Sequence, residues 1–86
     1  MPLGFPAQVG LAAYEAVRVS SENTRQNDVG AARMAFDAGG TFAAYDAAIK
    51  ASDIAHHTRL VSGARANGIN ASGSLLALRR SGVDVV

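Results

Sequence analysis

Alanine recurs at every fourth position in the middle of this sequence, from residue 43 to residue 55. Positions four apart lie on one face of an α-helix, so the spacing predicts a helix that carries a stripe of methyl groups. Such a stripe lets a second helix approach closely. We therefore predict a helix-packing seam, either within the chain or between copies of it, formed by Ala43, Ala47, Ala51 and Ala55.

The residues around the seam predict where its helix begins and ends. Gly39-Gly40 is a strong helix terminator, and Thr41 is suited to cap the helix that follows it. Asn67-Gly68 is typical of a left-handed C-cap. The sequence therefore predicts a helix over about residues 42–66.

The remaining sequence predicts further helices and an all-α fold. Apolar residues recur at helical spacing over about residues 7–19, 28–38 and 72–80. Because the polar segment between the first two is poor in strong helix formers, we expect a break near Ser20 to Asn27, with Asn27 or Asp28 as the next N-cap. A helix exposed on all sides is the alternative for this segment.

The chain is short enough for one small helical domain over residues 1–86. Two prolines and a glycine predict an extended N-terminal arm over residues 1–6, and we expect a C-terminal tail over residues 81–86. The N-terminus lacks the basic start of a signal peptide, and no stretch approaches the roughly 20 apolar residues that span a bilayer. We expect a soluble chain with no stable membrane span.

Composition predicts a thin hydrophobic core. Hydrophobic residues make up 49% of the chain, but alanine is the most frequent of them, and there are three Phe, two Tyr and no Trp. Burial of alanine releases little free energy, because stabilisation follows apolar area. We expect a helical hairpin that oligomerisation or docking onto a larger partner completes. With no cysteine, the chain has no disulfide and no thiolate ligand.

One group of side chains has the chemistry of a metal or acid-base site. Asp53 and His57 lie one helical turn apart on one face, whereas His56 points about 100° away. A third ligand is missing. We therefore expect a surface ion pair or hydrogen bond here, and we predict no metal, no cofactor, no catalytic residue and no enzymatic activity.

The last third of the chain is locally basic, although the net charge is only +1. Residues 54–83 contain four arginines and no acidic residue. These side chains are possible nucleic-acid contacts, but without interleaved aromatic residues a solvated surface is the favoured explanation. The four are Arg59, Arg65, Arg79 and Arg80.

Turn-forming residues interrupt the helical pattern in RANGINASGSLLALRR, residues 65–80. Gly68 is suited to end one helix in the left-handed conformation, with Ile69 as the apolar contact beneath the turn. Asn70, Ser72 or Ser74 can cap the next helix. The leucines that follow are the densest apolar cluster in the chain, and we predict that they form a docking surface, made of Leu75, Leu76 and Leu78.

This stretch resembles a segment of the internal virion proteins, of the ejection type, of short-tailed bacteriophages. The resemblance covers about residues 57–86 and rests on a corner of small and turn-forming residues that follows an Ala/Arg helix, namely Gly68, Ile69, Asn70, Ser72, Gly73 and Ser74. It implies a helical structural protein present in several copies in the virion. Such a protein associates with itself and with a portal or tail complex during assembly or genome delivery. The alternative is a small cytoplasmic regulatory or nucleic-acid-binding module that uses the C-terminal arginines.

Overall fold

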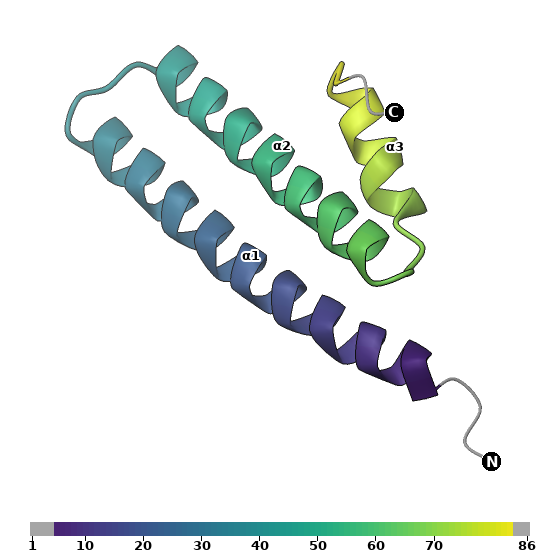
Figure 1. The fold of residues 1–86 in the computed structure, drawn as a ribbon. Helices are drawn as coiled ribbons and strands as arrows, with labels where there is room; N and C mark the ends of the chain where they lie inside the picture. The colour runs from purple at the N-terminus through teal and green to yellow at the C-terminus, as the bar shows by residue number, and fades with distance from the viewer. Residues whose placement is uncertain (1–4, 84–86) are drawn as a thin grey trace.

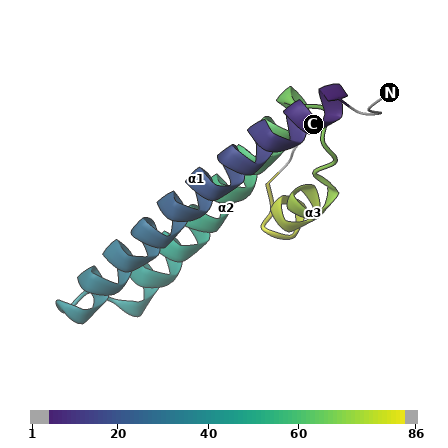
Figure 2. The same ribbon diagram turned by 90° about the horizontal axis from the view of Figure 1, so that it is seen from below.

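The computed structural model describes residues 5–83, which form three α-helices and no strand. The helices are α1 (Phe5–Asp37), α2 (Phe42–Ala66) and α3 (Ser72–Arg80). α1 and α2 form an antiparallel hairpin, and α3 turns back beside α2 (Figure 1). Figure 2 shows α3 set to one side of this pair. The predicted all-α fold is confirmed, and α1 and α3 do not pack against each other.

The expected break between residues 20 and 27 is wrong, because α1 continues through this segment as one helix of 33 residues. Its polar side chains are used within the helix and across the hairpin. Glu22 pairs with Arg25 one turn later at 2.6 Å, and Arg25 also lies 3.7 Å from Asp53 of α2. Ser21 is buried against α2. Tertiary contacts therefore override the weak helix propensity, and Asn27 and Asp28 are interior residues of the helix rather than caps.

The two ends of the chain differ in part from expectation. α1 begins at Phe5, so Phe5 and Pro6 belong to a helix and not to an extended arm. Pro6 is tolerated there because the first turn has no intrahelical partner for its missing N–H. The rest of the predicted arm, residues 1–4, lies outside the described residues. Of the predicted tail, Ser81 to Val83 closes α3, and residues 84–86 are not described.

The predicted boundaries of α2 and α3 agree with the structure, and both helices end in the same way. Gly68 has a φ of 67° and Gly82 a φ of 82°. The following residue donates its amide back to the helix: Ile69 to the Ala64 carbonyl at 2.8 Å, and Val83 to the Leu78 carbonyl at 3.0 Å. This is the Schellman arrangement, which requires a residue in the left-handed conformation. Local sequence alone therefore determines both ends.

The hairpin is held together by close approach of small residues. A methyl group at Gly10 of α1 would lie 2.6 Å from the Asn67 carbonyl oxygen, and one at Gly63 of α2 would lie 2.8 Å from Val17. The buried hydrophobic residues among those described are few and mostly small. They are Ala32, Leu60, Val61, Ala64 and Leu78.

Substitution of two glycines in α1 tests this packing. Gly10→Ala should destabilise the protein by about 1–3 kcal/mol, because the new methyl group meets backbone that must move. Gly30→Ala, with nothing within 4 Å of the added methyl group, should instead stabilise by up to about 1 kcal/mol. Urea unfolding followed by circular dichroism measures both. Destabilisation by Gly30→Ala would contradict a continuous α1.

Candidate functional site

A cluster of polar side chains lies between α1 and α2. The Ser21 hydroxyl of α1 is 2.8 Å from Nδ1 of His56, and Nε of Arg59 donates a 2.7 Å hydrogen bond to the same hydroxyl. The Arg59 Nη2 group also reaches the Ser21 carbonyl oxygen at 3.3 Å. Ser21 is 2% exposed and His56 is 9% exposed. One serine therefore binds two side chains of the opposite helix.

The hydrogen bonds determine which ring nitrogen of His56 carries the proton. Arg59 has only donors, so the Ser21 oxygen accepts from it and donates its own hydrogen to Nδ1 of neutral His56. The His56 proton is then on Nε2, which lies 3.7 Å from the Glu22 carboxylate. In this arrangement the Ser21 hydroxyl both donates and accepts a hydrogen bond, and the Nε2–H group of His56 faces the Glu22 carboxylate.

Charged groups at the edge of the cluster tune its protonation. Burial lowers the pKa of His56 below its ordinary value, and repulsion by His57 adds to this effect, whereas Glu22 acts in the opposite direction. Hydrogen bonds from Arg25 are the main cause that lowers the pKa of Glu22 to about 2. The structure therefore favours a neutral histidine beside an ionised glutamate.

The cluster brings together a serine, a histidine and a carboxylate, which are the components of a hydrolytic triad. Its geometry suits a link between helices better than a nucleophile. Ser21 is almost fully buried, and its hydroxyl is already occupied by Arg59 and His56. A reacting carbonyl carbon would have no approach to that oxygen. No sequence pattern reveals this cluster, because Ser21 and His56 are 35 residues apart and no local motif connects them.

The predicted pair of Asp53 and His57 is divided between two sets of contacts. Asp53 lies 3.7 Å from Arg25 of α1, and Nδ1 of His57 lies 3.3 Å from the Ser74 hydroxyl of α3. Each side chain therefore contacts a different helix, Asp53 in an ion pair and His57 in a hydrogen bond. Among the described residues there is no group of three or more His, Asp or Glu side chains placed to hold a metal ion.

The four C-terminal arginines do not form one patch. Arg59 is turned into the helix interface by its bonds to Ser21. Arg65, Arg79 and Arg80 are exposed and lie in the last turns of α2 and α3, where a positive charge is favourable beside the helix C-terminus. Nucleic-acid contact by these side chains stays a prediction.

The corner between α2 and α3 contains the predicted parts with one difference. Gly68 and Ile69 close α2 as expected, but the N-cap of α3 is Ala71, whose side chain cannot accept a hydrogen bond. Asn70, the residue before this N-cap, accepts a hydrogen bond instead: its Oδ1 receives the Ser72 amide at 2.9 Å. The exposed Gly73 lies in the first turn of α3. The corner is thus an Asx turn followed by a short helix.

The three predicted docking leucines differ in how far they are exposed. Leu78 is 1% exposed and is buried where α3 packs on α2. Leu75 is half-buried, and Leu76 is 49% exposed. The docking surface of α3 is thus in large part satisfied by α2 of the same chain.

The predicted alanine seam does not form the core of the hairpin. Three of its residues, Ala43, Ala47 and Ala51, are exposed, and Ala55 is half-buried. α2 buries a different set of side chains, namely Ser52, His56, Leu60, Val61 and Ala64. Packing of the alanines between copies of the chain stays a prediction.

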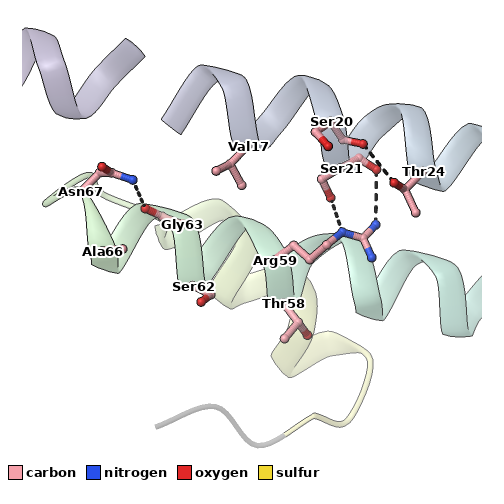
Figure 3. Close-up of a pocket in the computed structure, with 10 residues that line it drawn as sticks. All are labelled: Val17, Ser20, Ser21, Thr24, Thr58, Arg59, Ser62, Gly63, Ala66 and Asn67. Atoms are coloured by element: carbon pink, nitrogen blue, oxygen red, sulfur yellow. Dashed lines mark hydrogen bonds between the residues drawn. The ribbon is translucent and has the colours of Figure 1, made fainter. Parts of the chain in front are cut away.

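An open groove runs along one side of the α1–α2 contact. One part, of about 530 Å³, is lined by small side chains such as Ser20 and Thr24 of α1 and Ser62 of α2 (Figure 3). A second part, of about 420 Å³, lies nearer the hairpin loop between Ala31 and Ala51. Both parts are lined by α1, α2 and the C-cap residue Asn67, and α3 lines neither.

Comparison with known protein families, with characterised proteins and with solved structures gives no match to this chain. None of the helices in the described part combines the length and the apolar character that a membrane crossing needs.

Removal of one hydroxyl tests the role of the cluster. Ser21→Ala should destabilise the protein by about 1–3 kcal/mol, because it leaves His56 and Arg59 without their shared partner. Ser20→Ala, at the neighbouring exposed position, should change the free energy of unfolding by less than about 0.5 kcal/mol. Urea unfolding measures both, and equal effects would contradict a structural role for Ser21.

The lowered pKa of His56 predicts a loss of stability in weak acid. Below its ordinary pKa of about 6.5, the unfolded chain binds a proton that the folded chain refuses, so the free energy of unfolding decreases as pH falls. Urea unfolding at about pH 7.5 and about pH 5.5 should show a larger decrease for the unaltered protein than for His56→Gln.

Glu22 does not obscure this comparison. Glu22, whose pKa is lowered from 4.5 to about 2, contributes stability that is lost only as pH falls from 4.5 toward 2. Identical pH dependence of the two proteins would show that His56 is not held neutral by burial.

Proposed function

We propose that this chain is a structural subunit that works in a multi-copy helical assembly. The observation that supports it most strongly is the area left exposed. A compact monomer of 8.8 kDa exposes about 4,800 Å², whereas this chain exposes 5775 Å². The difference of about 1,000 Å² is close to the area, about 800 Å², that each partner buries in a standard interface.

The open arrangement of the helices explains this excess. α2 has a neighbour on two sides, but α1 and α3 each pack on α2 alone. The radius of gyration is 15.8 Å, compared with about 12 Å for a compact domain of this length. A chain with so few large buried side chains gains its missing apolar contacts most readily from another subunit.

The setting that we propose for this assembly is a bacteriophage virion, in association with the portal, the tail or the internal core. The resemblance of residues 57–86 to ejection-type proteins is the support for this setting. Mass spectrometry of purified particles tests it, and absence of the chain from them would exclude it.

The alternative function, a nucleic-acid-binding module, loses support from the engagement of Arg59 with Ser21. DNA binding whose affinity falls steeply as the salt concentration rises would support this alternative.

Association in solution tests the core of the proposal. Sedimentation equilibrium of the unaltered chain should show reversible self-association, and the midpoint of thermal unfolding should rise when the concentration is raised about a hundredfold. Any ligand or partner that binds only the folded form stabilises it by mass action, which is the physical reason for the shift. A monomer whose midpoint is independent of concentration would contradict self-assembly.

A further inference from the structure

One side of the hairpin, which we call the small-residue face, is covered by small side chains along the groove described above. From α1 it carries Ser20, Thr24 and Ala31, and from α2 it carries Ala51, Ala55 and Ser62. In each helix the three positions are spaced by four and then seven residues, which keeps them on one side over three turns. The face is therefore shaped for the close approach of further helices.

A buried hydroxyl group of this face has no hydrogen-bond partner among the residues that the structure describes. Ser52 is 5% exposed, lines the groove beside Ala51 and Ala55, and makes no hydrogen bond through Oγ. A buried hydroxyl without a partner costs free energy comparable to a lost hydrogen bond. This observation points to an occupant of the groove that brings a polar group to Ser52.

A second copy of the same face has the properties that such an occupant needs. Its alanines allow the helices to come close, and its serine and threonine side chains bring hydroxyl groups to the groove in which Ser52 lies. The exposed area in excess of a compact monomer is the size of one such contact per chain. A face of this kind, paired with itself about a two-fold axis, gives a closed dimer.

The charges at this face favour an antiparallel copy. Asp28 lies at the level of Ala51 and Ser52, and Arg59 lies four residues beyond Ala55 in the other direction. A two-fold axis at the level of Ala55, perpendicular to the helices, places Asp28 of one copy at the level of Arg59 of the other. Opposite charges then meet, and like charges are kept apart.

We propose that two copies of this chain pack small-residue face against small-residue face, antiparallel, so that α1 and α2 of each copy form a four-helix bundle. This inference rests on the proposed function, because it requires that the chain self-associates. α3 does not line the groove in either copy. In Figure 3, which looks onto the groove, α3 lies behind α2.

Single cysteines test the proposal directly, because the chain has no cysteine of its own. Ala55→Cys lies at the proposed axis, where the two sulfurs come within disulfide reach, so mild oxidation should give a covalent dimer on a non-reducing gel. Asn23→Cys, exposed on α1 away from the groove, is the matched control and should stay largely monomeric. Circular dichroism shows whether each variant retains its helical content.

The outcomes separate this inference from the proposed function. Self-association with a cross-link at residue 23 and none at residue 55 would overturn the small-residue face and leave the multi-copy subunit standing. A chain that is monomeric at every concentration, with no cross-link at either position, would overturn both.

Bulky substitution supplies a second, independent measurement. Ala51→Leu should weaken the dimer by about tenfold or more, because a large side chain in the groove forces close-packed helices apart. Lys50→Ala, exposed in the same turn but outside the groove, should change the dissociation constant by less than about threefold. Equal and small effects of the two substitutions in sedimentation equilibrium would mean that this face is turned to solvent.

Discussion

Close approach of α1 and α2 is the constraint on which the rest of the structure depends. Gly10 lies against the backbone of Asn67, and Gly63 lies against Val17, so neither position has room for a methyl group. At this separation the short side chain of Ser21 reaches both His56 and Arg59 across the interface. With larger residues at the contact, the same hydroxyl would end short of α2. The polar cluster is therefore a consequence of the small-residue packing.

The polar cluster in turn fixes the alignment of α1 and α2 along their axes, which contacts between small residues do not. Contacts between alanines are similar at neighbouring turns, so they discriminate poorly between a correct alignment of two helices and one that is shifted along the axis. A shift of α1 by one turn would remove Ser21 from His56 and leave buried polar atoms unpaired, at a cost of several kcal/mol. Buried polar groups are known to specify alignment in this way. Here they set the alignment of the hairpin, while apolar burial supplies the attraction.

Local chemistry explains which parts of the fold could be predicted from sequence. The ends of α2 and the end of α3 depend on a glycine, a cap residue and their immediate neighbours, and both helices have the predicted bounds. The continuity of α1 depends on contacts such as Arg25 with Asp53, which no local pattern reveals. The Ser21 cluster is hidden for the same reason, since its partners come from positions 35 and 38 residues away.

The alanine ladder shows that a correctly predicted helix need not pack within its own chain along its most regular stripe. Four residues of an α-helix advance by about 400°, so a stripe at every fourth position winds around the helix by about 40° per step. The ladder starts at Ala43 outside the groove, and only Ala51 and Ala55 at its other end line the groove. A face that runs straight along a hairpin needs steps of four mixed with steps of three. Ser20, Thr24 and Ala31 follow that pattern, and so do Ala51, Ala55 and Ser62, which is why the groove extends along both helices.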